Sequence, residues 1–241
     1  MWQQRELRTL NLSANKIKQI SPDISNLVNL EMIDLGHNQI AEIPMDIGAL
    51  QHLWSYLYLH DNKITNIPEE ITQLIKLEYL NISQNQLQEL PNEIGNMICL
   101  KELKAEMNQL SFLPDSFGNL IHLQEINLSN NQLTELHPNF RNLSSLRVLC
   151  LNNNECSQIP VDNSELKELK LRNNNIAQIT KEIANIHQLR KLDLRGNRIT
   201  SIPKEILELD QLERLDLRWN PITKLPNWVN DLKALKCLVW V

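Results

Sequence analysis

The sequence predicts a right-handed α/β solenoid, with a curved parallel β-sheet on the concave side and turns or short 3-10 or α-helices on the convex side. Two observations predict it: a unit of about 23 residues recurs along the chain, and each unit alternates like a strand before ending in one helical turn. The clearest unit is LEYLNISQNQLQELPNEIGNMIC, residues 77–99, with leucine-type residues at its first, fourth, sixth, eleventh and fourteenth positions. Neither a lone helix nor a lone strand has this spacing.

Ten full units follow one another after a short lead. They begin at Leu7, Leu30, Leu53, Leu77, Leu100, Leu123, Leu146, Leu166, Leu189 and Leu212, and a partial eleventh begins at Leu235. No linker, low-complexity run or change of composition separates them. We therefore predict that residues 1–241 form a single domain.

Within each unit, the side chains of the strand point alternately to the two faces of the sheet. Positions four and six point into the core, while positions three, five and seven point to the concave face, because strand side chains alternate. The strand pairs in parallel with that of the next unit, and the apolar residues at positions eleven, fourteen, eighteen and twenty-one fill the same core. One unit alone cannot offset its chain entropy, so the units must stack.

The ninth position of every full unit is asparagine. A buried amide without partners would cost a few kcal/mol, but this side chain has two donor hydrogens and an acceptor for the backbone groups where the strand turns away. We predict a structural ladder formed by Asn15, Asn38, Asn62, Asn85, Asn108, Asn131, Asn154, Asn174, Asn197 and Asn220.

The pattern LxxLxLxxN resembles the leucine-rich repeat. The segments IPEEITQL (67–74), LPNEIGNM (90–97), LPDSFGNL (113–120) and IPKEILEL (202–209) are similar to the LPxxIxxL subclass. That subclass includes Ras-pathway scaffolds of animal cytosol, plant intracellular Ras-group proteins and bacterial proteins, among them secreted effectors. The resemblance covers residues 7–241 and implies the solenoid fold and a role in protein recognition. It names no partner, since the motif residues are core residues.

Two units depart from the common length. Unit three has one extra residue, which predicts a bulge before its strand and an exposed Trp54. Unit seven is three residues short, which predicts a missing helical turn between Val161 and Glu165. Cys156 and Ala105 replace expected core leucines, so we expect an underfilled core around them.

The last strand is also unusual. Leu238 and Trp240 fall at the core positions of a strand that no further unit follows in this sequence. An uncovered strand edge with an apolar end favours association. We therefore expect either more protein beyond this end or an end-to-end contact with another molecule.

The composition excludes several functions. The net charge of -5 argues against nucleic-acid binding, and no apolar run approaches the ~20 residues of a membrane span. The four cysteines lack paired spacing, which predicts reduced thiols and a cytoplasmic location. No phosphate, zinc or redox motif is present, so we predict no cofactor and no metal.

Catalytic and metal-binding candidates are weak. His37 and His60 stand in adjacent concave columns near acidic residues, but solvated surface histidines are the preferred interpretation. Cys150 faces outward without a histidine beside it, so nucleophilic catalysis is disfavoured. We predict that the chain is not an enzyme.

The concave face carries the functional prediction, because the core does not need its residues. An aromatic patch in units two to four comprises Met32, His37, His60 and the tyrosine cluster (Tyr56, Tyr58 and Tyr79). Units eight to ten carry the arginine column (Arg172, Arg195 and Arg218). Exposed aromatics and arginines are the residue types that anchor protein interfaces. The predicted partner-binding residues are Met32, Tyr56, Tyr58, His60, Tyr79, Arg172, Arg195, Arg214, Arg218 and Trp219.

We therefore expect a protein–protein interaction module, acting as a cytosolic signalling scaffold or adaptor, or as a bacterial effector in the cytosol of a host. One alternative is recognition of phosphate or acidic lipid by the arginine column, with strong salt dependence. Another is that both clusters are ordinary solvated strand faces, since tyrosine has a high strand propensity and aspartates accompany the arginines. Catalysis ranks last.

Overall fold

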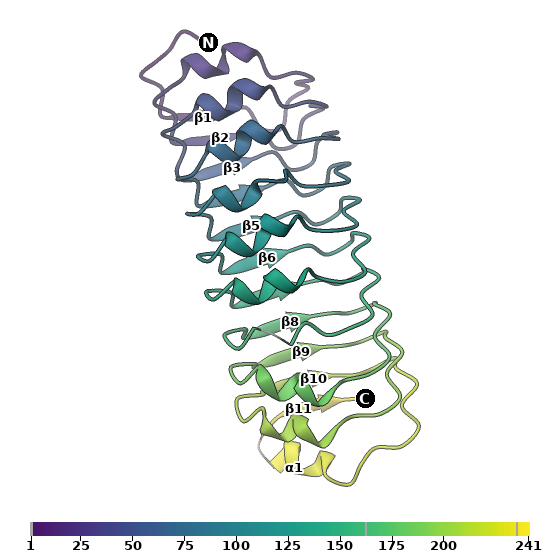
Figure 1. Ribbon diagram of the computed structural model, residues 1–241. Coiled ribbons are helices and arrows are strands. Elements are labelled where there is room, and N and C mark those ends of the chain that lie inside the picture. The colour runs from purple at the N-terminus through teal and green to yellow at the C-terminus, as the bar shows by residue number, and fades with distance from the viewer. Residues whose placement is uncertain (1, 162, 235) are drawn as a thin grey trace.

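Eleven short strands form one parallel sheet in which the order of the strands follows the sequence. The computed structural model describes residues 2–161, 163–234 and 236–241, and Figure 1 shows their coils stacked in one column. The strands are β1 (Thr9–Asn11), β2 (Met32–Asp34), β3 (Tyr56–Tyr58), β4 (Tyr79–Asn81), β5 (Glu102–Lys104), β6 (Glu125–Asn127), β7 (Val148–Cys150), β8 (Glu168–Lys170), β9 (Lys191–Asp193), β10 (Arg214–Asp216) and β11 (Leu238–Trp240).

The return segments on the opposite side contain single helical turns, so the predicted solenoid is confirmed. Most are 3-10 helices, which suit short connections, and the last is an α-helix. They are η1 (Pro22–Asn26), η2 (Met45–Ala49), η3 (Glu69–Gln73), η4 (Ile94–Asn96), η5 (Asp115–Asn119), η6 (Pro138–Asn142), η7 (Lys181–Asn185), η8 (Lys204–Glu208) and α1 (Val229–Ala234).

The core runs the length of the column between the sheet and these helices. The strand register pairs equivalent positions of neighbouring units, for example Leu57 with Leu80. In unit four the apolar positions are all at most 2% exposed, namely Leu77, Leu80, Ile82, Leu87, Leu90, Ile94 and Met97. Because each coil shares its core with both neighbours, position in the unit determines burial.

The asparagine at position nine bonds two coils together. The Asn85 amide donates to the carbonyl oxygens of Ile82 (3.1 Å) and Ser83 (3.1 Å) in its own coil. It also donates to Leu59 O of the preceding coil at 3.0 Å, and its Oδ1 accepts from Ile64 N at 3.0 Å. One side chain thus satisfies four backbone groups at the turn that ends the strand.

The same arrangement recurs along the column. From the second unit to the tenth, each of these amides donates to carbonyls of its own and the preceding coil. Asn15 is different: it is exposed, and its amide donates to Leu12 O and Ser13 O of its own coil, which is the first coil among the described residues.

Unit seven lacks a helix. In the described part of the chain no helix lies between β7 and β8, as predicted, and the row of helical ribbons in Figure 1 is interrupted there. The predicted range includes residue 162, which lies outside the described residues. Asn163 is buried nearby, and its amide donates to Leu143 O at 2.7 Å. The extra residue of unit three leaves Trp54 47% exposed beside β3, also as predicted.

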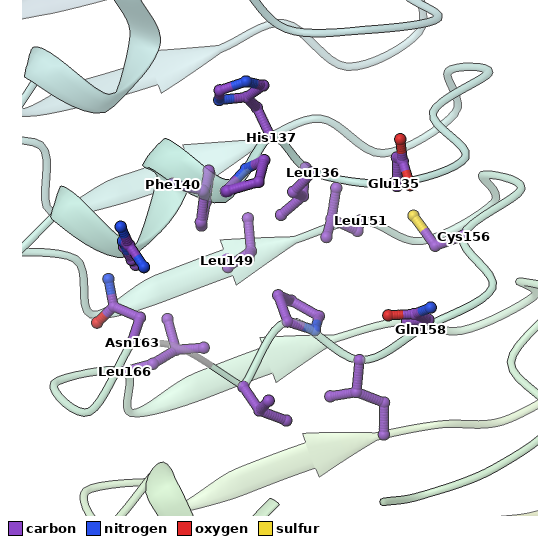
Figure 2. Close-up of a pocket in the computed structure, with 15 residues that line it drawn as sticks. Glu135, Leu136, His137, Phe140, Leu149, Leu151, Cys156, Gln158, Asn163 and Leu166 are labelled. Atoms are coloured by element: carbon purple, nitrogen blue, oxygen red, sulfur yellow. The ribbon is translucent and has the colours of Figure 1, made fainter. Parts of the chain in front are cut away.

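The missing turn leaves a cavity of about 370 Å³ (Figure 2). Leu149 of β7 and Leu151, which directly follows this strand, point into it, and Phe140 of η6 and Cys156 line its sides. The expectation of an underfilled core thus holds at Cys156. Ala105 is fully buried and does not line this cavity.

The register of the last strand differs from the prediction. Leu215 pairs with Val239, so Val239 takes the core register, and the predicted core residues Leu238 (54%) and Trp240 (38%) are exposed. The α1 helix and the left-handed turn at Lys236 (φ 65°) use one more residue than the 3-10 turns do. A shift of one residue reverses the face of each side chain. The predicted start of this unit, Leu235, lies outside the described residues.

We expect Asn85→Ala to lower the free energy of unfolding by on the order of 3 kcal/mol, because it leaves several buried backbone groups without partners. Urea denaturation followed by circular dichroism measures this. Asn96→Ala, at an exposed position of η4, is the matched control and should change stability by less than ~0.5 kcal/mol. Equal losses in both variants would contradict the structural role.

We expect Cys156→Leu to raise the free energy of unfolding by about 1 kcal/mol, because the larger side chain extends into the cavity and buries more apolar surface. Ala105→Leu, at a fully buried position outside the cavity, should lower stability by ~1–3 kcal/mol through overpacking. Thermal and urea denaturation of both variants test the contrast. A destabilised Cys156→Leu would show that the cavity cannot accept the side chain.

Candidate functional site

The tyrosine cluster forms a packed aromatic surface on the concave face. The parallel register places Tyr56 beside Tyr79. The rings of Tyr56 and Tyr58 stack at 5.7 Å with an interplanar angle of 6°, and the ring of Tyr79 lies 5.4 Å from Tyr56 and 5.2 Å from Tyr58. Lys104 Nζ lies 5.4 Å from the centre of the Tyr79 ring. These contacts hold the rings in place while Tyr56 stays 41% exposed.

The hydroxyl groups of Tyr58 and Tyr79 remain protonated at neutral pH. Burial raises the pKa of Tyr58, and the neighbouring tyrosines raise it further. Burial also raises the pKa of Tyr79, against the lowering effect of Lys104. The cluster therefore presents neutral hydroxyl groups together with apolar rings, a combination suited to protein surfaces. Two predicted contacts adjoin it: Met32 pairs with Tyr56, and the His60 ring lies 5.8 Å from Tyr58.

Two arginines of the arginine column pair with the aspartates that the sequence places beside them. Arg195 Nε donates to both carboxylate oxygens of Asp193, at 2.9 and 3.0 Å. Arg218 donates to both oxygens of Asp216, at 2.9 and 2.6 Å. Asp216 also lies 3.5 Å from Arg195 Nε, so one carboxylate joins two arginines. These pairs fix the guanidinium groups and remove most of their mutual repulsion.

Trp219 joins the ends of this column. The Arg172 guanidinium lies 5.4 Å from its ring centre, and that of Arg218 lies 5.8 Å away. Arg218 also lies 5.9 Å from Trp240, which reaches the concave face because of the register shift. We call Arg172, Arg195, Arg218, Trp219 and Trp240 the arginine–tryptophan cluster.

Trp219 occupies an unfavourable backbone position. The residue before each ladder asparagine is left-handed, with φ between 52° and 66°. Three units place asparagine there and one places Gly196, which suit this region. A bulky side chain costs roughly 1–2 kcal/mol in this conformation, yet Trp219 is 65% exposed and contributes little to the core. Its contribution therefore lies at the surface.

The predicted residues form two separate groups. Met32, His60 and the tyrosine cluster lie together near the N-terminal end, whereas Trp219 and the arginine column lie together near the C-terminal end. Arg214 lines a shallow hollow of about 200 Å³ beside Asp216 and Trp240. Sequence reasoning missed Trp240, because a one-residue change of register is invisible in the repeat pattern. It also missed the contact between the Lys104 ammonium group and the Tyr79 ring. Lys104 is at position five of its unit, so the sequence did predict that its side chain points to the concave face.

The Cys150 thiol lacks the environment of a nucleophile. Burial raises the pKa of the Cys150 thiol, with Lys170 acting in the opposite direction, whereas a nucleophilic cysteine needs a lowered pKa. Across the described residues, no three His, Cys, Asp or Glu side chains gather as metal ligands. No helix within the same ranges is long and apolar enough to cross a membrane.

Comparison with known families identifies the repeat. A leucine-rich repeat region model matches residues 54–163 and 164–241, and a second model for two copies of the leucine-rich repeat matches residues 5–52. The chain belongs to the leucine-rich repeat family. Neither model describes an enzyme.

Solved leucine-rich repeat structures share the fold over almost the whole chain. A leucine-rich repeat protein of Leptospira interrogans is 30% identical with a TM-score of 0.73, over 98% of this chain and 73% of that one. The plant peptide hormone receptor RGFR1, solved in complex with RGF2, is 27% identical with a TM-score of 0.82, over 98% of this chain and 40% of the receptor.

Curated relatives match shorter stretches of the repeat array. Leucine-rich repeat serine/threonine-protein kinase 1 of Caenorhabditis elegans is 42% identical over 50 residues, which are 20% of this chain and 2% of the kinase. Human lumican is 39% identical over 66 residues, which are 27% of this chain and 19% of lumican. These matches span a small part of each relative. They therefore support the presence of the repeat in this chain, and they carry no information about the rest of those proteins.

We expect the ion pairs of Asp216 to make stability depend on acid pH. Burial raises the pKa of Asp216, but the bonds from Arg218 and the charges of Arg218 and Arg195 outweigh burial and bring the pKa below its ordinary value of 3.8. A lowered pKa adds stability above the ordinary pKa, and that stability is lost as the pH falls through the folded-state pKa.

Asp216→Asn should therefore be less stable than the original chain at neutral pH, and the difference should shrink as the pH falls below 3.8. Urea denaturation across this pH range measures it. Asp210→Asn, at an exposed position, serves as the control. A difference that is independent of pH would show that the carboxylate charge is not responsible.

Proposed function

We propose that this leucine-rich repeat chain binds a partner protein along its concave face. The observation that carries the proposal is that both clusters are built on positions the core leaves free. Tyrosine, tryptophan and arginine are the side chains most enriched at interface hot spots. One solved relative supports a binding role, since RGFR1 was solved in complex with RGF2.

The two clusters suit one extended partner surface. Eleven strands spaced ~4.8 Å apart give a strip of roughly 50 Å, and a standard interface needs ~800 Å² per partner. The tyrosine cluster offers apolar area with neutral hydroxyl groups. The arginine–tryptophan cluster offers flat cationic and aromatic surfaces already held by aspartates, so little side-chain entropy is lost on binding.

We further propose that the chain belongs to the LPxxIxxL subclass and acts as a scaffold or adaptor in the cytosol, or as a bacterial effector in the cytosol of a host. The motif segments support the subclass. The four cysteines, none of them in a disulfide, fit a reducing compartment. The exposed apolar end at β11 fits an end-to-end contact with another molecule.

Recognition of phosphate or acidic lipid is the second candidate. Arg172 favours it, because within the described chain this arginine makes no ion pair. Arg195 and Arg218 weigh against it, since each already has a carboxylate partner. Steep loss of binding with added salt would indicate the anionic ligand rather than a protein surface.

The test is capture of partners from the native or host cytosol with four chains: the original, Tyr58→Ala, Trp219→Asn and Arg195→Glu. Bound proteins are identified by mass spectrometry, and affinity for the captured partner is then measured. We expect each variant to weaken binding by at least ~30-fold, equivalent to ~2 kcal/mol for a hot-spot residue. Trp219→Asn should fold at least as stably as the original, because asparagine suits the left-handed position.

Met45→Ala is the matched control, since Met45 is 65% exposed in η2 on the convex side. It should leave binding unchanged. Equal binding by the original and all three concave variants would refute the proposed surface, and loss in Met45→Ala alone would move it to the convex side.

A further inference from the structure

Two histidines meet at the N-terminal end of the concave face. His37 Nε2 and His60 Nε2 lie 3.2 Å apart. Their ring centres are 4.6 Å apart, and the ring planes are nearly perpendicular at 82°. The two residues come from neighbouring coils, so the stacking of units two and three brings them together.

A carboxylate orients one of the two rings. His37 Nδ1 lies 2.7 Å from Asp61 Oδ2, which directs His37 Nε2 away from the carboxylate and toward His60. A carboxylate on the far nitrogen is the usual partner of a metal-bound imidazole, because it fixes the ring orientation and increases the basicity of the ligand.

The backbone leaves room for the other ring. A Cβ atom added at Gly36 would lie 2.3 Å from Cε1 and 2.8 Å from Nδ1 of His60. Gly36 is not in the left-handed region, so its conformation does not require glycine. Its missing side chain instead provides the space in which the His60 ring lies. His37 itself is left-handed, with φ 55°, a region in which histidine is enriched among residues other than glycine.

We propose that His37 and His60 bind one divalent transition-metal ion of the kind that prefers imidazole, namely Zn²⁺, Ni²⁺ or Cu²⁺. Zn–N bonds of ~2.0–2.1 Å and the 3.2 Å separation of the two nitrogens give an N–Zn–N angle of about 100°. That angle lies between square-planar and tetrahedral coordination. The two nitrogens therefore already stand at the separation of a bidentate site.

The site is open on one side. No third His, Cys, Asp or Glu ligand joins the pair within the described residues, so the remaining coordination positions are open to ligands from outside the pair, near the Tyr58 ring that lies 5.8 Å from His60. Affinity is accordingly weaker than that of a closed four-ligand site. The side chain of a bound partner has access to the open positions. The metal site does not depend on the proposed protein partner, and its test needs no partner.

The experiment is calorimetric titration of the untagged chain with Zn²⁺, and separately with Ni²⁺, near neutral pH. We expect saturable binding of a single ion. His37→Gln and His60→Gln should each weaken binding by at least 10-fold. Asp61→Asn should weaken it by ~10-fold through the loss of ring orientation, and Gly36→Ala should do so by displacing His60.

His187→Gln is the matched control, since His187 is exposed and distant from the pair in the repeat order. It should bind as the original does. Electron paramagnetic resonance of the Cu²⁺-loaded chain should show nitrogen ligation that is reduced in both histidine variants. Circular dichroism melting without metal confirms that each variant folds.

Absence of saturable binding in the folded original chain would overturn the proposal and leave only a hydrogen bond between the two rings. Unchanged binding in both His37→Gln and His60→Gln would also overturn it, because the ion would then bind elsewhere.

Discussion

The buried asparagine amide is the interaction on which the rest of the structure depends. At the end of each short strand the backbone turns away, and its carbonyl and amide groups lose their sheet partners. The position-nine side chain of one coil supplies these partners for two coils at once, as Asn85 does between units three and four. Because the same bonds recur at each turn, every coil leaves the sheet in the same direction, and the strands keep equivalent positions in register.

This register separates stability from recognition. Positions four and six are committed to the core, so the columns at positions three, five and seven can vary without loss of packing. The tyrosine cluster and the arginine–tryptophan cluster both use this freedom. Internal contacts hold both clusters in place, through ring stacking in the first and through Asp193 and Asp216 in the second. Such preorganisation lowers the entropy that binding would otherwise cost.

The repeat period was sufficient to predict the strands, the direction of nearly every side chain, the exposed Trp54 and the missing turn of unit seven. These features follow from position within a unit. The sequence could not predict the last strand, because the length of α1 depends on packing at the end of the column, and one residue of difference exposed Leu238 and Trp240. The sequence placed His37 and His60 in adjacent columns, but it could not predict the orientation of their rings, which depends on Asp61 and Gly36. The partner-binding residues stay predictions, although the structure shows which of them lie together.

The gap in unit seven has a consequence for the mechanics of the array. The convex helices η5 and η6 pack together, as do η7 and η8, but no helix of the described chain lies between η6 and η7. There the sheet and the asparagine bonds join the coils without a convex layer to resist bending. In a linear array whose stability is the sum of contributions from single coils and from contacts between neighbours, this joint lacks the helix–helix contact that η5 and η6 make. The two aromatic clusters lie on opposite sides of it, so flexing at this joint would adjust the span between them to the dimensions of whatever is bound.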